Sequence, residues 1–322
     1  MSLVAKLPSK PLLTRSPRFI RNVHAMLGSR DFDLVLINGS DLLWLIPELP
    51  YHIPKILIAH NIEHQLFLSQ IDATYPRSRL LRGILLRDWR HLRDYEMSGM
   101  RLVENIIFLS SLDARFALGQ NSRIQALTIP PIFDYPAPEE RGPKGVGEGI
   151  RIGFMGNFRW WPNQEGLGWF LKEVFPQTTG DTRLHLFGEA SGRIARDARV
   201  VNHGFVANMA DIWRTCDFMI CPIHRGGGVN VKFAEAVYNR MPVLATSFAA
   251  RGLPLEPDPS VVLLDRADEW VSFLLSPAAR ELRARRLPAR MANAFAMESH
   301  VQSVQGFVQS AIARKKRSIG DR

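Results

Sequence analysis

The chain has 322 residues, of which 46% are apolar and 22% are charged, and its formal net charge is +10. This length suffices for two domains, and the composition is that of a globular protein with hydrophobic cores. Because no apolar run approaches the roughly 18 residues of a transmembrane segment and the N-terminus has no apolar h-region, we expect neither a membrane span nor a signal peptide.

Basic residues are concentrated in three segments, 1–30, 77–96 and 313–317, and the first of these contains no acidic residue. Such clusters attract nucleic acid, anionic membrane headgroups or charged substrates, although a solvated basic face has the same composition. The sequence contains no helix-turn-helix, zinc-finger or RRM signature, so we expect no nucleic-acid partner.

Short, almost continuously apolar runs alternate with helical patterns along the chain. Runs of this kind are typical of parallel strands that are buried on both faces, and the alternation predicts α/β units with helices on both sides of a sheet. The expected strands are 34–37, 56–59, 106–109, 150–155, 183–187, 218–221, 243–245 and 261–264, and the expected helices include 17–27, 165–174, 229–238 and 267–275.

The segment 130–149 is rich in proline, glycine and charge, and it separates two sets of strands. The two cysteines, Cys216 and Cys221, fit no zinc spacing, and we expect both to be buried thiols in a reducing compartment. The predicted organisation is an N-terminal domain over 1–140, a C-terminal domain over 141–300, and a helix with a basic tail over 301–322.

The segment HRGGGVNVKFAE, residues 224–235, follows an expected strand and begins an expected helix. Such a unit directs backbone N–H groups and the positive end of a helix to one point, where a phosphate can bind. Lys232 can reach the same anion from the first turn of the helix, and Arg225 flanks the loop. Glu235 lies on a neighbouring part of the helix face, where a carboxylate suits the hydroxyls of a ribose. Alternatively, Gly226, Gly227 and Gly228 could form a tight turn that binds no ligand.

A second strand end that could face the same ligand carries Gly156 and Asn157, after the expected strand 150–155. Asn163 is a candidate N-cap for the helix that follows. Glycine would allow the backbone to approach a ligand closely, although a turn followed by a capped helix explains the pattern equally well.

Two further strand ends carry candidate residues. In the motif HGFV, residues 203–206, the backbone of Phe205 and Val206 could meet the edge of a base, or the motif could be a plain strand end. In the N-terminal half, the expected strand 56–59 is followed by His60, which could bind a ligand or have a structural role.

Taken in order, these motifs resemble those of the glycosyl transferases group 1, which are retaining nucleotide-sugar glycosyltransferases with two facing Rossmann-like domains, the GT-B fold. The resemblance covers residues 30–310 and is most specific in the C-terminal half. The matching motifs are IAHNIE at 58–63, SSLD at 110–113, GNFRWWPN at 156–163, LFG at 186–188, HGFV at 203–206, GGGVNVKFAEA at 226–236, PVLAT at 242–246 and GL at 252–253.

The resemblance implies transfer of a sugar from a nucleotide-diphosphate donor, with retention and without a metal ion or other cofactor. The acceptor would be a saccharide or a lipid-linked molecule in polysaccharide or glycolipid biosynthesis. By position, His60 would be catalytic beside the donor sugar, Glu235 would bind the ribose, and Phe205 and Val206 would meet the base. The residues that would contact the diphosphate or the donor sugar are Gly156, Asn157, Asn163, Arg225, Gly226, Gly227, Gly228 and Lys232.

The sequence departs from the family pattern at its diphosphate site and at its N-terminus. Gly227 stands where the family has the first glutamate of its E-x7-E motif. Asn157 and Asn163 replace an arginine and a lysine, so we expect Arg225 and Lys232 to carry the diphosphate charge. The family's first domain normally begins with further strands and a glycine-rich loop. We therefore expect an incomplete N-terminal domain, which a partner chain could complete.

The sequence therefore supports two hypotheses about the function of the chain. The first is a glycosyltransferase in the cytoplasm, held peripherally on the inner face of an anionic membrane by its basic segments. The second is a truncated and inactive homologue that binds a nucleotide sugar or serves as a partner subunit.

Overall fold

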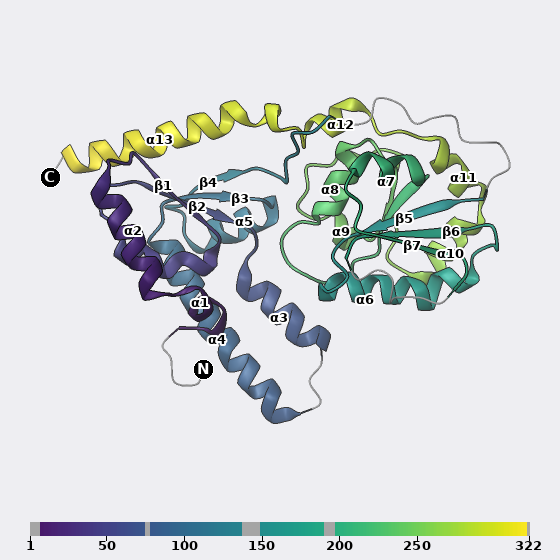
Figure 1. Cartoon of the computed structure of the whole chain (residues 1–322), viewed down its shortest axis with the longest axis horizontal. Coiled ribbons are helices and arrows are strands. Elements are labelled where there is room, and N and C mark those ends of the chain that lie inside the picture. Colours follow the sequence, from purple (N-terminus) through teal and green to yellow (C-terminus); the bar gives the residue numbers. More distant parts are fainter. Residues whose placement is uncertain (1–6, 75–77, 137–148, 190–196, 321–322) are drawn as a thin grey trace. The chain divides into compact units, whose positions relative to one another are not determined.

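The structure is a computed structural model that describes residues 7–74, 78–136, 149–189 and 197–320. It divides the chain into two compact units: unit 1 comprises Met1–Ile129 and His300–Arg322, and unit 2 comprises Pro130–Ser299 (Figure 1). The expected domain boundary between residues 140 and 141 lies outside the described residues. The C-terminal helix, expected to follow the second domain as a separate segment, groups with unit 1.

The sheet of unit 1, within the described residues, has four parallel strands that lie side by side in chain order. They are β1 (Val35–Asn38), β2 (Lys55–Ala59), β3 (Asn105–Phe108) and β4 (Gln125–Thr128). The helical elements are α1 (Ser9–Thr14), α2 (Pro17–Ser29), the 3-10 segment η1 (Ser40–Glu48), α3 (Glu63–Thr74), α4 (Arg79–Arg101), α5 (Ser111–Gln120) and α13 (Val301–Gly320).

The two faces of this sheet bury different sets of side chains, because successive residues of a strand point to opposite sides. Ile56 and Ile107 pack with Ala311 of α13, which runs along one face of the sheet (Figure 1). Leu57 and Phe108 pack on the other face with side chains of η1 and α5. Among the described residues, no helix combines the length and the apolar character needed to cross a membrane.

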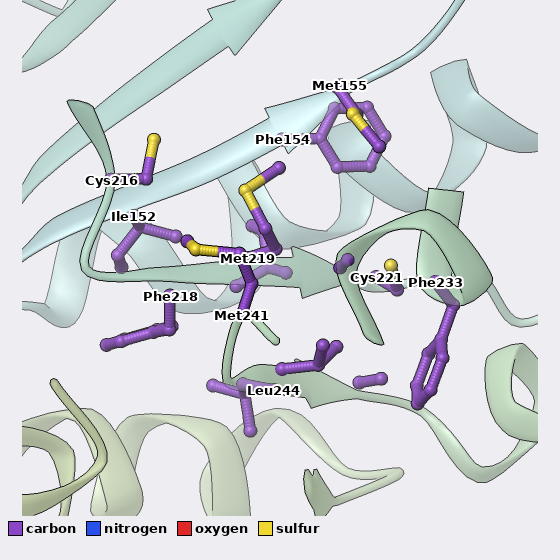
Figure 2. Packing of buried hydrophobic residues seen from close by; sticks show 14 of the residues in the cluster. Ile152, Phe154, Met155, Cys216, Phe218, Met219, Cys221, Phe233, Met241 and Leu244 are labelled. Atoms are coloured by element: carbon purple, nitrogen blue, oxygen red, sulfur yellow. The ribbon is translucent and has the colours of Figure 1, made fainter. Parts of the chain in front are cut away.

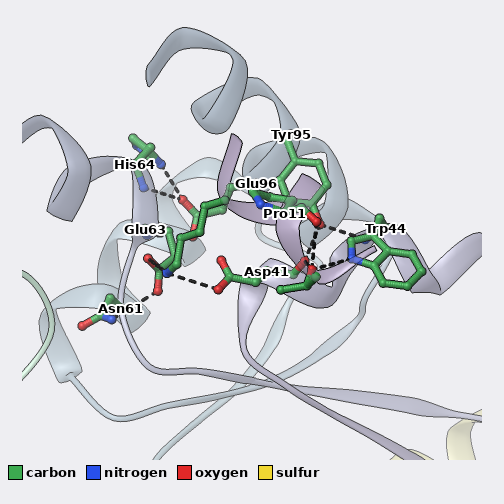
Figure 3. Close-up of polar contacts among 10 residues, drawn as sticks. Pro11, Asp41, Trp44, Asn61, Glu63, His64, Tyr95 and Glu96 are labelled. Carbon is green, nitrogen blue, oxygen red and sulfur yellow. Dashed lines mark hydrogen bonds and ion pairs between the residues drawn. The ribbon is translucent and has the colours of Figure 1, made fainter. Parts of the chain in front are cut away.

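The buried carboxylate of Glu96 joins α4 to the start of α3 (Figure 3). It accepts hydrogen bonds from the backbone N–H groups of Glu63 at 2.9 Å and His64 at 3.0 Å, and from Nδ1 of His64 at 2.7 Å. A negative charge at the N-terminus of a helix satisfies its free N–H groups and complements its dipole. Lys10 of α1 forms ion pairs with Glu63 and Asp41, so the same cluster also holds the first helix.

The described part of unit 2 contains a parallel sheet of six strands in the order β10-β9-β8-β5-β6-β7. The strands are β5 (Arg151–Met155), β6 (Arg183–Phe187), β7 (Val200–Gly204), β8 (Phe218–Cys221), β9 (Val243–Ala245) and β10 (Val261–Leu263). The helical elements are α6 (Trp161–Trp169), the π-helical turn η2 (Phe170–Val174), the 3-10 turns η3 (Phe175–Gln177) and η5 (Met297–Ser299), α7 (Met209–Thr215), α8 (Val231–Tyr238), α9 (Ser247–Ala250), α10 (Ala267–Leu275), α11 (Pro277–Ala284) and α12 (Ala289–Asn293).

The core of unit 2 is closely packed around β5 and β8, as Figure 2 shows. A Cβ on Gly153 would lie 2.5 Å from Sδ of Met219 and 2.6 Å from Sγ of Cys216, so only glycine fits at this point of β5. Cys216 and Cys221 are both buried and neither is in a disulfide within the described residues, which confirms their predicted burial. Burial raises the pKa of Cys221 to about 12, so this thiol stays protonated.

The parallel sheets confirm the predicted α/β class with Rossmann-like units, and most strands lie where the apolar runs indicate. The predicted strands 183–187, 218–221 and 243–245 have these bounds in the structure. The strand β4 was not among the expected ones, and β7 was indicated only by the possible strand end at 203–206. Each lies at the edge of its sheet and is largely half-buried or exposed, so its sequence lacks the continuous apolar run of a central strand.

Candidate functional site

A cavity of about 600 Å³ lies at the carboxyl ends of the strands of unit 2. β5 and β8 are neighbours there and the order of strands reverses between them, which is where ligands bind in open parallel sheets. The volume falls within the roughly 300–1,000 Å³ range of small-molecule sites. Every predicted site residue of unit 2 lines it: Gly156, Asn157, Asn163, Phe205, Val206, Arg225, Gly226, Gly227, Gly228, Lys232 and Glu235.

The glycine-rich loop brings backbone donors to the cavity wall at the N-terminus of α8. Gly226 and Gly228 adopt φ angles of 145° and 59°, which disfavour any residue with a side chain. Asn230 caps the helix by accepting a hydrogen bond from the N–H of Phe233. Among the described residues, no hydrogen bond to a protein acceptor is recorded for the N–H groups of the three glycines, residues 226–228. Free donors at a helix N-terminus favour an anionic ligand.

Lys232 supplies a positive charge to the same wall. Its ammonium donates to Oδ1 of Asn163 at 2.5 Å and lies 5.1 Å from the centre of the Phe154 ring. Within the described part of the chain, it forms no ion pair with a carboxylate. Burial lowers the pKa of Lys232 to about 8, because a cation is costly in a low-dielectric site without an opposite charge. A bound anion would remove most of this cost.

Asn163 contacts both Asn157, in the loop after β5, and Lys232 of α8. Its predicted role as an N-cap is wrong. α6 begins at Trp161, and Pro162 in the first turn fits a helix start. Asn163 therefore lies inside the helix, buried, where Nδ2 donates to the carbonyl of Asn157 at 2.8 Å and Oδ1 accepts from Lys232. A Cβ on Gly156 would lie 2.7 Å from this Nδ2, so the close contact requires glycine.

Arg225 and Arg251 both line the cavity, and they differ in their contacts with the protein. Arg225 is largely exposed, and its Nε lies 3.5 Å from Oε1 of Glu165, so part of its charge is offset within the protein. Arg251 was not predicted as a site residue. It donates to the carbonyl of Gly226 at 3.1 Å and stacks on Phe248 at 3.6 Å. Its position next to the GL motif at 252–253 is the only sequence signal for it. Arg251 supports the loop through Gly226, whereas Lys232 contacts Asn163 on the cavity wall.

Glu235 lies half-buried on α8, three residues after Lys232. Its Oε1 accepts a hydrogen bond from the hydroxyl of Tyr135 at 2.8 Å. Burial raises the pKa of Glu235, while the bond from Tyr135 opposes this effect. Tyr135 was not predicted, because nothing in its local sequence indicates a contact with α8.

Phe205 and Val206 lie on the cavity wall after β7. The Phe205 side chain is 78% exposed, which is unusual for a large aromatic ring and makes it available for stacking. Val206 is half-buried against the core of unit 2.

His60 belongs to unit 1, where it follows β2, and its ring is exposed. Its Nε2 lies 2.6 Å from Oδ1 of Asn38, the last residue of the neighbouring strand β1. The other polar residues of the same motif have structural contacts: Asn61 donates to Glu63, and Glu63 binds Lys10. The catalytic role that the sequence predicts for His60 stays a prediction.

Comparisons with known proteins agree with this geometry. Residues 149–271 match the profile of the family Glycosyl transferases group 1. A search of curated protein sequences finds no significant match. Among solved structures, the pneumococcal O-GlcNAc transferase GtfA in complex with UDP and GlcNAc has a TM-score of 0.60 at 13% identity, covering 90% of this chain and 60% of GtfA.

Two further solved structures show the same fold. A trehalose-6-phosphate synthase has a TM-score of 0.53 at 13% identity, over 94% of this chain and 80% of the synthase. TarM has a TM-score of 0.53 at 12% identity, and the match covers 85% of this chain but only 54% of TarM. This chain therefore spans about half the length of TarM, and the similarities establish the GT-B type of fold rather than an activity.

Proposed function

Because residues 149–271 match the profile of the glycosyl transferases group 1 family, we propose that the protein is a retaining glycosyltransferase. It moves a sugar from a nucleotide-diphosphate donor to a saccharide or lipid-linked acceptor in polysaccharide or glycolipid assembly. The observation that carries the proposal is Lys232, a half-buried cation with no anionic partner among the described residues, beside three glycines at the N-terminus of a helix. The solved neighbours agree: one is a complex with UDP and GlcNAc, and another is a study of glycosyl transfer with retention.

The diphosphate is proposed to bind between the loop 226–228 and Lys232. As the bond between the sugar C1 and the diphosphate oxygen breaks, negative charge grows on the leaving nucleoside diphosphate. Lys232 and the free N–H groups are already placed where that charge develops, so they stabilise the transition state without reorganisation. They supply the positive charge that a divalent cation provides in other enzymes, and we therefore propose a reaction that is independent of metal ions.

The remaining parts of the donor are assigned to the neighbouring side chains of the cavity. Glu235 accepts from the hydroxyls of the ribose, and the segment around Phe205 and Val206 contacts the base. His60, contributed by unit 1, is proposed to act at the donor sugar. Replacing His60 with alanine should then lower kcat while the affinity for the nucleotide is retained.

The helical hairpin of α3 and α4 is the part of unit 1 best suited to an anionic membrane (Figure 1). α4 directs Arg79, Arg87 and Arg90 outward, and its first turn exposes Leu80 by 76% and Leu81 by 48%. Basic residues around exposed leucines are the combination with which helices bind the headgroup region of anionic membranes. We propose that this hairpin holds the enzyme on the cytoplasmic face of a membrane, where lipid-linked acceptors are found.

The membrane proposal is tested by sedimentation with vesicles of neutral lipid alone and with added anionic lipid. The chain should bind only the anionic vesicles and dissociate as the salt concentration rises. Replacing Leu80 and Leu81 with aspartate should abolish binding. The matched control is Leu102→Asp, because Leu102 is 59% exposed at the other end of the same helix. Equal binding by both variants would remove the hairpin from the account, and binding to RNA in place of vesicles would indicate a nucleic-acid partner.

The enzymatic proposal is tested first by binding and then by turnover. UDP, GDP and ADP and their common sugar conjugates are screened for a rise in the midpoint of thermal unfolding, since a ligand at 100 times its Kd stabilises by about 2.7 kcal/mol. Transfer from the donor that binds is then followed by NMR, which reports the anomeric configuration of the product. Binding with transfer and retention supports the proposal. Binding without transfer to any saccharide or lipid-linked acceptor would favour the inactive homologue, and the absence of binding would contradict the enzyme and leave the partner subunit as the remaining hypothesis.

A further inference from the structure

The carboxylate of Glu235 is held by a hydroxyl from a segment far away in the sequence. Tyr135 donates to Oε1 of Glu235 at 2.8 Å. Nδ2 of Asn239 donates to the hydroxyl oxygen of Tyr135 at 2.9 Å and to the backbone carbonyl of Glu235 at 2.8 Å. Because the hydroxyl oxygen already accepts from Asn239, its single proton points to Glu235.

The ring of Tyr135 is itself fixed in place. It packs edge-on against Phe133 and Tyr238, with ring centroids 6.0 Å and 5.4 Å away, and the hydroxyl of Tyr238 donates to its backbone carbonyl. Phe133 is anchored on both sides, because its N–H donates to Phe295 and its carbonyl accepts from Met297. The donor to Glu235 is therefore preorganised before any ligand binds.

The pKa shifts of Tyr135 and Glu235 agree with donation from the tyrosine to the carboxylate. Burial raises the pKa of Tyr135, and the nearby charge of Glu235 raises it further, so the phenol keeps its proton and remains a donor. Burial also raises the pKa of Glu235, while the bond from Tyr135 stabilises the ionised form. An ionised carboxylate is the better acceptor for two neighbouring hydroxyls.

We propose that Tyr135 is a positioning residue for nucleotide recognition. By donating to Oε1, it fixes the Glu235 carboxylate so that Oε2 accepts from the 2′- and 3′-hydroxyls of the ribose. Tyr135 thereby determines the preference of the site for ribose over 2′-deoxyribose. The inference rests on the proposed function, because it requires that a nucleotide occupies the cavity of unit 2.

The test compares ribose and 2′-deoxyribose ligands by calorimetry on the full chain. The probes are UDP, GDP and ADP, each with its 2′-deoxy form. The variants are Tyr135→Phe, which removes the donor, and the control Tyr51→Phe, which removes a hydroxyl from an exposed tyrosine of unit 1. Loss of a charge-assisted hydrogen bond should lower the affinity of Tyr135→Phe for the ribose form about tenfold. Its affinity for the 2′-deoxy form should change by less than about twofold, and Tyr51→Phe should keep the full preference.

The outcomes distinguish a positioning role of Tyr135 from a purely structural role and from failure of the proposed function. If the natural protein prefers ribose and Tyr135→Phe keeps that preference, the positioning role is wrong while the proposed function stands. Equal losses for both ligands would show that Tyr135 only supports the fold. If the natural protein binds none of the nucleotides, the proposed function fails and this inference fails with it.

A double-mutant cycle distinguishes a coupling between Tyr135 and Glu235 from two independent contributions to binding. In a Glu235→Gln background, the added Tyr135→Phe change should alter ribose affinity by less than about twofold, because the two residues act as one unit. Additive losses of about tenfold from each change would overturn the coupling.

Discussion

A buried carboxylate in unit 1 and a half-buried lysine in unit 2 have opposite surroundings. Glu96 has no exposed surface, and it accepts three hydrogen bonds from Glu63 and His64. Lys232 donates to the neutral side chain of Asn163 and, in the described residues, has no carboxylate partner. It also borders a cavity of about 600 Å³, whereas the Glu96 carboxylate lies entirely within the protein.

The two sites contrast a charge that stabilises the fold with a charge that we propose recognises a ligand. The protein satisfies Glu96 from its own backbone, so the charge contributes to stability and offers nothing to solvent. The protein leaves Lys232 with a lowered pKa, so its charge is best stabilised by an anion that arrives from outside. Substitutions at the two sites should therefore have opposite effects on stability and on binding.

The largest expected effect is on nucleotide binding when Lys232 is replaced by methionine. Loss of the buried cation should lower the affinity for the donor about 100-fold, while the free energy of unfolding of the ligand-free protein stays the same or rises by about 1 kcal/mol. Calorimetry and chemical denaturation measure the two quantities. The control is Lys172→Met, which removes the same charge from an exposed site of unit 2. A large loss of stability with little loss of affinity would place Lys232 among the structural charges.

The converse is expected for Glu96→Gln. The amide cannot accept all three hydrogen bonds, so the free energy of unfolding should fall by about 2 kcal/mol. The affinity for the nucleotide should not change, because Glu96 belongs to unit 1 and the cavity to unit 2. Urea unfolding measures the first quantity and calorimetry the second. An unchanged unfolding curve would show that the Glu96 cluster does not stabilise unit 1.

A third effect concerns pH. Lys232 has a lowered pKa of about 8 in the free protein, and a bound diphosphate raises it, so affinity for a nucleotide sugar is highest below pH 8. Above that value, affinity should fall by up to about tenfold per pH unit. In the ligand-free protein the sign is reversed: stability rises as pH passes through 8 towards the usual lysine value, because the unfolded state then binds more protons. Calorimetry across this range should show no such slope for Lys232→Met.

The smallest expected effect is at the rim of the cavity. Phe205→Ala should lower the affinity for a nucleoside diphosphate about fivefold, by loss of stacking on the base. Because the side chain is 78% exposed, the free energy of unfolding should change by less than about 0.5 kcal/mol. Inorganic diphosphate is the informative control ligand, since it should bind this variant as it binds the natural protein. Equal losses for both ligands would mean that Phe205 shapes the diphosphate site instead.

The parts of the fold that depend on local sequence were predictable. Continuous apolar runs identify the buried strands, and the residues that follow them lie at the carboxyl ends of a parallel sheet. The glycine loop, Lys232 and Glu235 lie within one strand-to-helix connection, so their association is a local property of the sequence. The edge strands β4 and β7 escaped the same reasoning, because edge strands are partly exposed.

The contacts that refine the site are long-range and have no local signature. Lys232 and Asn163 are 69 residues apart in the sequence, and Tyr135 and Glu235 are 100 apart. Lys232, the side-chain partner of Asn163, comes from α8 and has no local signal in the sequence around Asn163, which explains why Asn163 was interpreted as a helix cap. Tyr135 lies in the segment predicted to separate two domains, and only the packing of that segment on α8 shows its contact with Glu235.

The most direct test of the account is an NMR measurement of the pKa of Lys232 on the full chain, with 13C at the lysine ε-carbon and with Lys232→Met to assign the signal. The account predicts a pKa near 8 in the free protein, and a rise of at least about one unit when the nucleotide-diphosphate donor is bound. A pKa near the ordinary lysine value in the free protein, or one that the donor does not change, would contradict the claim that this buried charge binds the diphosphate.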